Sequence, residues 1–142
     1  MNCFDLPEST RAYIAGLFDG EGSVAIYREN SRLKYNSFLY MATITNTNRE
    51  VLDYVQHLLG GSITTEDRTP IKNKTCHRWV LKSDKACEFF HMVHEFSIIK
   101  KRELEIAMYF WSLPVVPGRP YTVEEVRQRE LLIEVLKMEK RR

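Results

Sequence analysis

Two acidic residues, Asp19 and Glu21, stand between glycines at the end of a short apolar segment, where their carboxylates could take part in chemistry. Gly16 and Gly20 are four residues apart. In a helix they share one face, and the missing side chains let a second backbone approach closely. Core packing alone does not require carboxylates beside such a contact. A site for a divalent metal does, because Mg²⁺ takes carboxylate oxygens as ligands.

Other interpretations of this segment are less well supported. A calcium loop beginning at Asp19 would need glycine where the chain has Val24, and a bidentate glutamate where it has Asn30. A phosphate-binding loop would end in Gly-Lys-Ser/Thr, which is absent here. The remaining alternative is a buried helix whose glycines only form its cap.

Residues 14–22, Ile-Ala-Gly-Leu-Phe-Asp-Gly-Glu-Gly, resemble the signature motif of the LAGLIDADG homing endonucleases. The segment differs from the motif's name by residues of similar size or chemistry at Ile14, Phe18, Gly20 and Glu21. In this family the helices of two motifs pack side by side, and the penultimate acid of each binds a divalent metal beside a DNA phosphate. The resemblance implies that Glu21 and the Gly20 carbonyl bind Mg²⁺, for which Ca²⁺ or Mn²⁺ can substitute in binding or cleavage.

Two further residues match the family by position. Asn46 corresponds to an amide-bearing residue that orders the water network, and Lys100 to a lysine that stabilises charge or assists proton transfer. From the sequence alone, Asn46 could instead be a helix N-cap and Lys100 a solvated helix start. The resemblance makes Glu21, Asn46 and Lys100 the candidate catalytic residues. Asp19 is expected to be a helix-end group, capping or in a second layer, with a weaker role at the metal as the alternative.

Hydrophobic periodicity predicts the elements that would position these residues. In chain order they are a helix at 7–19, strands at 23–29 and 37–45, a helix at 49–59, strands at 62–67 and 76–82, and helices at 83–94, 100–113 and 122–142. The first two strands alternate over their whole length, which indicates a half-buried antiparallel pair. Capping signals support the helix ends: residues 46–48, Gly60-Gly61, Ser83, and a capping box formed by Thr122 and Glu125.

The resulting order, αββαββα with additional C-terminal helices, is that of the LAGLIDADG fold. The expected fold class is therefore α+β with an antiparallel DNA-binding sheet. The 142 residues are enough for one hydrophobic core, so residues 1–142 are expected to form a single domain.

The chain holds one copy of the motif, and family members with one motif act as homodimers. The physical argument agrees, because a helix that carries Gly16 and Gly20 on one face needs a partner, and an identical helix can provide it. The residues expected at this dimer interface are Tyr13, Gly16, Leu17 and Gly20.

Positive charge is concentrated in the predicted strands and their loops. Segments 23–47 and 61–82 have a net charge of +5, whereas residues 1–22 have −3. Binding to DNA phosphates would favour this distribution, although a solvated sheet edge would too. The expected DNA contacts are Ser23, Ala25, Tyr27, Glu29, Arg32, Lys34, Ser37, Leu39, Met41, Thr43, Thr45, Ser62, Thr64, Glu66, Arg68, Lys72, Lys74, Arg78, Val80 and Lys82. A strand of ten to twelve residues spans roughly 35 Å, or about ten base pairs per protomer.

The cysteines and the hydropathy of the chain indicate where the protein is expected to work. Three cysteines without Cys-x-x-Cys spacing indicate a reduced, intracellular protein, and no apolar run is long enough to span a membrane. The compartment would be a mitochondrial or chloroplast matrix for an organelle-encoded chain, or the cytoplasm of a prokaryote. Cys87, His91 and His94 could share a helix flank and bind zinc. The simpler interpretation of that flank is partly buried packing with solvated histidines.

Together these features predict a homodimeric LAGLIDADG endonuclease. It would make a site-specific, Mg²⁺-dependent double-strand break with short 3′ overhangs in double-stranded DNA, within a long and partly palindromic target. Two alternatives use the same fold: a maturase that binds intron RNA, and a DNA-binding protein that does not cleave.

Overall fold

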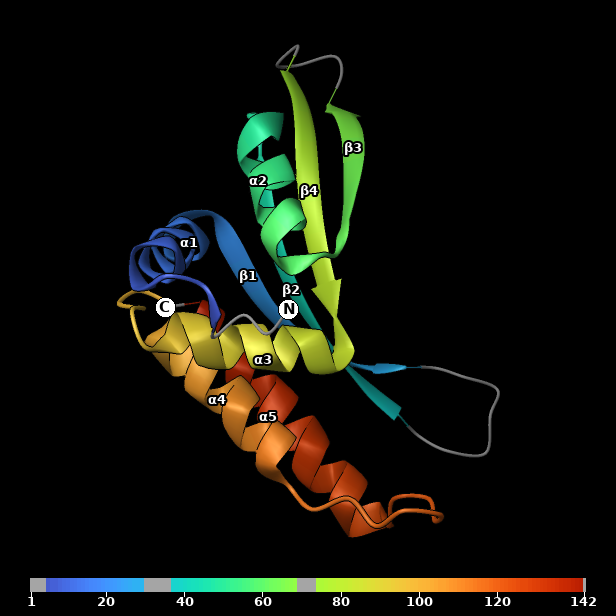
Figure 1. Cartoon of the computed structure of the whole chain (residues 1–142). Coiled ribbons are helices and arrows are strands. Elements are labelled where there is room, and N and C mark those ends of the chain that lie inside the picture. Colours follow the sequence, from blue (N-terminus) through green and yellow to red (C-terminus); the bar gives the residue numbers. More distant parts are fainter. Residues whose placement is uncertain (1–4, 30–36, 69–73, 142) are drawn as a thin grey trace.

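The computed structural model describes residues 5–29, 37–68 and 74–141 (Figure 1). Its elements are α1 (Glu8–Glu21), β1 (Gly22–Glu29), β2 (Ser37–Asn46), α2 (Arg49–Leu59), β3 (Ser62–Arg68), β4 (Lys74–Lys82), α3 (Ser83–His94), α4 (Lys101–Ser112) and α5 (Val123–Lys140). The predicted α+β order, αββαββα followed by two helices, is confirmed. Three predicted DNA contacts lie outside the described residues: Arg32, Lys34 and Lys72.

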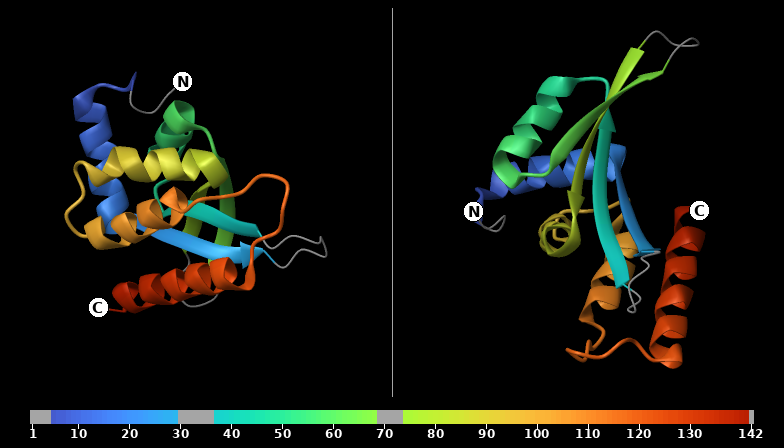
Figure 2. Two further views of the ribbon diagram at one scale, coloured as in Figure 1. Left: turned by 90° about the horizontal axis from the view of Figure 1, so that it is seen from below. Right: turned by 90° about the vertical axis from the view of Figure 1, so that its right-hand side faces the viewer.

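The four strands form one antiparallel sheet in the order β1-β2-β4-β3. Helices α1, α2 and α3 cover one face of this sheet (Figure 2). The strand residues buried under them alternate as the sequence predicts: Val24, Ile26, Ala42, Ile44, Trp79 and Leu81. Residues of the opposite parity therefore point to the other face, away from α1, α2 and α3.

Aromatic rings fix α1 to the rest of the core. The Phe18 ring packs edge-on against Phe89 of α3, with 5.1 Å between centroids, and Phe89 packs in the same way against Trp79 of β4 at 5.3 Å. All three side chains are fully buried. The end of α1 is therefore held against both α3 and the sheet.

Helix α1 ends two residues later than predicted, so Gly20 and Glu21 belong to its last turn. The chain then passes directly into β1 at Gly22. A Cβ atom at Gly22 would overlap the Phe18 ring and carbonyl. Glycine at this position is what allows the helix to continue to Glu21 before the strand begins. Pro7 is the N-cap of α1 rather than its first residue.

The other capping signals are confirmed with one exception. The side chain of Asn48 caps α2 by accepting from Val51 N at 3.2 Å, and both bonds of the capping box begin α5. Ser83 is the exception, because α3 has no side-chain cap and its N-cap residue is Lys82. Ser83 instead adopts a left-handed φ of 64°, which turns the chain from β4 into α3.

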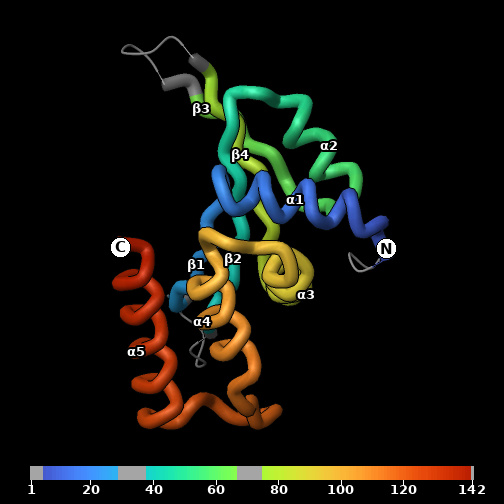
Figure 3. The backbone as a smooth tube through the Cα atoms, turned by 90° about the vertical axis from the view of Figure 1, so that its left-hand side faces the viewer, coloured from blue at the N-terminus to red at the C-terminus, as the bar shows by residue number. Residues whose placement is uncertain are grey.

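Helices α4 and α5 run antiparallel beside the edge strand β1 (Figure 3). Ile133 and Leu136 of α5 are buried in the hydrophobic core, and so are Leu104, Ala107 and Phe110 of α4. The pair therefore extends the structure past the edge of the sheet and brings the C-terminal end of α5 beside the start of β1.

The turn between α2 and β3 offers a test of the fold. Gly61 has φ +90°, and a Cβ atom there would lie 2.6 Å from Val80 O and 2.8 Å from Trp79 Nε1. We expect Gly61→Ala to lower the free energy of unfolding by about 2–4 kcal/mol in a urea titration. Gly118, with φ +81° and open space around it, is the control. Gly118→Ala should cost only about 1 kcal/mol, and equal losses would contradict the close contact at Gly61.

Candidate active site

The carboxylate of Asp19 joins the C-terminal end of α1 to the turn before α4. It accepts a short hydrogen bond from the Ser97 hydroxyl, together with bonds from the backbone N–H groups of Ile98 at 2.7 Å, Ile99 at 3.1 Å and Lys100 at 3.2 Å. Ile98, Ile99 and Lys100 precede the first residue of α4, and the backbone N–H groups of such a turn need an acceptor, which the carboxylate provides. Asp19 is thus a helix-end group of α1, as predicted, and its carboxylate holds the turn before α4.

These hydrogen bonds also set the ionisation of Asp19. Burial disfavours the charged carboxylate, but the bonds from Ser97 and the three backbone N–H groups outweigh it and lower the pKa of Asp19 below its ordinary value. The residue is only 8% exposed. Asp19 is therefore an ionised structural anchor that is fully engaged with its own chain.

Lys100 is brought to the same place by this anchor. Its Nζ donates to the backbone carbonyl of Asp19 at 3.1 Å, and the residue is half-buried. The carbonyl end of a helix carries partial negative charge, which favours a cation there. Lys100 is the N-cap residue of α4, but it is not the freely solvated helix start that the sequence left open.

Glu21 has the opposite environment. It is exposed in the last turn of α1, beside the exposed Gly20, and no hydrogen bond or ion pair joins its side chain to any other described residue. Its carboxylate is free to bind a ligand. The described residues contain no group of three or more His, Cys, Asp or Glu side chains suited to a metal. A cation at Glu21 would therefore need other ligands as well, such as the Gly20 carbonyl, water or phosphate.

Asn46 lies at the end of β2, next to the start of β1, since Gly22 pairs with Ile44. Its Oδ1 accepts from the backbone N of Asn48 at 2.8 Å. Because Asn48 caps α2, the N-cap interpretation of Asn46 is wrong. The Nδ2 group of Asn46 has no hydrogen-bond partner within the described part of the chain, so it remains available as a donor.

The sheet face turned away from α1–α3 carries the predicted DNA contacts in rows. One row crosses all four strands: Ser23, Thr43, Val80 and Ser62. The exposed members of this face are Tyr27, Ser62, Thr64, Glu66, Arg78 and Lys82, and the half-buried ones are Ser23, Ala25, Leu39, Met41, Thr45 and Val80. For four further predicted contacts only the backbone is described: Glu29, Ser37, Arg68 and Lys74.

Thr43 is a correction to the predicted contacts. It has the expected parity, but it is only 4% exposed, in the middle of the sheet. Ser23 and Val80 flank it on the neighbouring strands. Its short side chain is enclosed by its surroundings, so it offers little surface to a ligand.

The outer face of α1 presents the predicted interface residues as one stripe. Tyr13 is 55% exposed, Gly16 and Gly20 are exposed, and Leu17 is half-buried. A Cβ atom at either glycine would meet no atom within 4 Å. The fold of a single chain therefore does not require glycine at these two positions.

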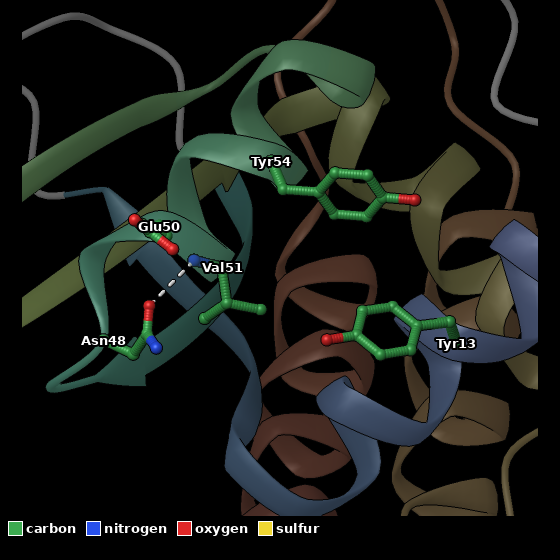
Figure 4. Close-up of a pocket in the computed structure, with 5 residues that line it drawn as sticks. All are labelled: Tyr13, Asn48, Glu50, Val51 and Tyr54. Carbon is green, nitrogen blue, oxygen red and sulfur yellow. Dashed lines mark hydrogen bonds between the residues drawn. The ribbon is translucent and has the colours of Figure 1, made fainter.

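An open pocket of about 390 Å³ lies beside this stripe, between α1 and α2 (Figure 4). Tyr13 and Tyr54 line it with their rings edge to face, 6.0 Å between centroids, and Asn48, Glu50 and Val51 complete the lining. The surface beside the stripe thus includes two aromatic rings, Tyr13 from α1 and Tyr54 from α2.

The zinc hypothesis for Cys87, His91 and His94 is wrong. Cys87 is buried, and this burial raises the pKa of its thiol to about 12. The His91 ring packs against Trp111, and His94 lies 3.4 Å from Glu105. These residues are packing and surface groups.

None of the described helices is long and apolar enough to cross a membrane.

The family model described as LAGLIDADG-like domain matches residues 8–94, which is more than half of the chain. This protein therefore belongs to the LAGLIDADG family. A comparison with curated proteins gives no match.

Solved structures of homing endonucleases share the fold. The archaeal intron-encoded I-Vdi141I, complexed with DNA, is 24% identical and aligns over 93% of this chain and 84% of its own, with a TM-score of 0.74. I-CvuI, in complex with the I-CreI target in the presence of 2 mM Mg, is 14% identical over 93% and 82%, with a TM-score of 0.71. I-TnaI is 18% identical over 96% and 97%, with a TM-score of 0.61.

The anchor at Asp19 can be tested through stability. Asp19→Asn should lower the free energy of unfolding by about 3 kcal/mol at pH 7, because charged hydrogen bonds to a buried acceptor are lost. Ser97→Ala, which removes one of the four donors, should cost about 1 kcal/mol. Both are measured by urea unfolding in EDTA.

The pH dependence gives a second check on this anchor. Since folding lowers the pKa of Asp19, its stabilisation is present above the ordinary pKa of about 4 and is lost as the pH falls through the folded value. The difference between wild type and Asp19→Asn should therefore shrink below about pH 4. A difference that grows in acid would contradict the anchor.

Proposed function

We propose that this protein is a homodimeric, site-specific DNA endonuclease that requires Mg²⁺. It makes a double-strand break with short 3′ overhangs in a long, partly palindromic target. The observation that carries the proposal is the contrast at the end of α1: Glu21 is exposed and pairs with no other described residue, while the Lys100 ammonium binds the same helix end. The DNA complexes among the similar structures support it.

Phosphodiester hydrolysis needs an attacking water, relief of charge on the phosphate oxygens and help for the leaving 3′-oxygen. Glu21 and the Gly20 carbonyl would hold Mg²⁺, which when bound neutralises charge and makes a coordinated water more acidic. Lys100 would stabilise negative charge on the phosphate or assist proton transfer. The free Nδ2 donor of Asn46 would orient water near the carboxylate.

The dimer follows from the stripe on α1. Two copies of this helix can approach closely at Gly16 and Gly20, with Tyr13 and Leu17 beside them. A two-fold axis between the helices would place one Glu21 near each strand of a duplex. This arrangement gives two cleavage centres, as a double-strand break requires.

The sheet face that carries Tyr27, Ser62, Thr64, Arg78 and Lys82 would bind the DNA. It offers donors and acceptors for base edges in the major groove, and cations for phosphates. At about ten base pairs per protomer, the dimer would cover about twenty pairs. An intron-RNA maturase or a non-cleaving DNA-binding protein remains the alternative function, and neither would need Glu21 as a metal ligand.

Substitution of Glu21 separates these functions. Glu21→Gln should lower Mg²⁺-dependent nicking at least about a hundredfold, because several kcal/mol of charge stabilisation are lost. DNA binding in EDTA should be unchanged or tighter, since a negative charge is removed. The matched control is Glu8→Gln, which neutralises another exposed acid on the same helix. Nicking that is equal in both variants would exclude the proposed mechanism.

The dimer contact is tested at Gly16. Gly16→Leu should leave the single chain folded, since its Cβ meets nothing within 4 Å, yet it should block close approach of a second helix. Light scattering should give the mass of one chain for this variant and of two chains for wild type. Gln128→Leu, which adds the same side chain to an exposed part of α5, should remain dimeric. A dimeric Gly16→Leu would contradict this interface.

A further inference from the structure

The last turn of α5 brings a second lysine to the end of α1. Lys140 Nζ donates to Ser23 Oγ at 3.3 Å, and Ser23 is only two residues beyond Glu21. The C-terminal end of α5 lies beside the start of β1 (Figures 2 and 3). Nothing in the local sequence around Lys140 predicts this placement, because 117 residues separate it from Ser23.

Helix α5 is held in this position along its length. Arg129 is buried, donates to Pro114 O at 2.9 Å and Glu125 O at 3.2 Å, and lies 4.4 Å over the Tyr121 ring. Glu130 forms an ion pair of 2.6 Å with Arg28 of β1. The position of Lys140 is therefore set by packing and polar contacts of the whole helix.

Glu103 of α4 lies near both lysines. It is half-buried, and burial raises its pKa although the charges of Lys100 and Lys140 act in the opposite direction. Glu139, the residue before Lys140, also lies near this carboxyl and pairs with Arg102 at 3.8 Å. Lys100 and Lys140 therefore both act electrostatically on the same carboxyl.

The charges of the two lysines are not neutralised by direct pairing. Among the described residues, neither Lys100 nor Lys140 forms an ion pair within 4 Å, whereas Lys137, one turn earlier on α5, pairs with Glu134 at 3.3 Å. An ammonium group has three donors, and each of these lysines uses one, to Asp19 O or to Ser23 Oγ. Donors and positive charge remain for an anion.

We propose that Lys140 is a second phosphate-binding lysine of the cleavage centre, supplied by the C-terminal helix. This inference rests on the proposed endonuclease function. Ser23 points to the sheet face that would bind DNA, so an ammonium beside it can meet the duplex backbone close to Glu21. Lysine suits this task as a compact point charge for phosphate oxygens.

The test compares Lys140→Met with Lys137→Met in the full chain. The matched control removes an exposed lysine from the same helix. For each variant, the affinity for a duplex target is measured at several salt concentrations in EDTA, and single-turnover cleavage is measured with Mg²⁺. Lys140→Met removes one phosphate contact from each protomer of the dimer, so it should reduce the slope of log K against log salt by about 2 and slow cleavage by about ten- to a hundredfold. Lys137→Met should match wild type, and Lys140→Arg should restore the salt slope.

If Lys140→Met and Lys137→Met agree in both measurements, the inference about Lys140 is overturned while the proposed function stands. If wild type binds but does not cleave, the proposed function fails, and the salt slope still decides whether Lys140 contacts phosphate. If Lys140→Met is destabilised in thermal unfolding, the slope of log K against log salt is measured for Lys140→Gln, and that value decides whether Lys140 contacts phosphate.

Discussion

The hydrogen bonds between the Asp19 carboxylate and residues 97–100 determine how the candidate site is assembled. They join the end of α1 to the start of α4 through four donors and place Lys100 beside the last carbonyls of α1. Since Phe18 is locked into the core next to Asp19, the last turn of α1 is fixed from both sides. Glu21 is thereby held at the surface, where its side chain forms no hydrogen bond or ion pair with any other described residue.

Adjacent residues of α1 thus have separate physical roles. Asp19 is buried and fully hydrogen-bonded, whereas Glu21 is exposed and available. The glycines divide in the same way: Gly22 is required by close contact with Phe18, while Gly16 and Gly20 have open space around them. Nothing in the described part of the chain packs closely against Gly16 or Gly20, and this open space is the basis of the proposed dimer contact.

The sequence predicted the order of elements and the two sheet faces, because period-two alternation reports directly on burial. It also predicted the α5 capping box and the capping of α2, since these depend on residues three or four apart. Predictions that depend on tertiary contacts failed: Thr43 was expected at the surface but is buried, and Ser83 was expected to cap α3 but has a left-handed backbone. The hydrogen bond from Ser97 to Asp19 was not predicted. The contact of Lys140 with Ser23 could not be predicted from the sequence, because it joins α5 to β1 across 117 positions of the chain.

The central claim is that two copies of this chain direct two Glu21 carboxylates to opposite strands of one duplex. The most direct measurement is to incubate the purified protein with a randomised duplex library and Mg²⁺ and to sequence the cleaved ends. We expect the ends to converge on one long target, with cut positions on the two strands related by two-fold symmetry and offset to leave short 3′ overhangs. Ends that are scattered, or confined to one strand, would contradict it.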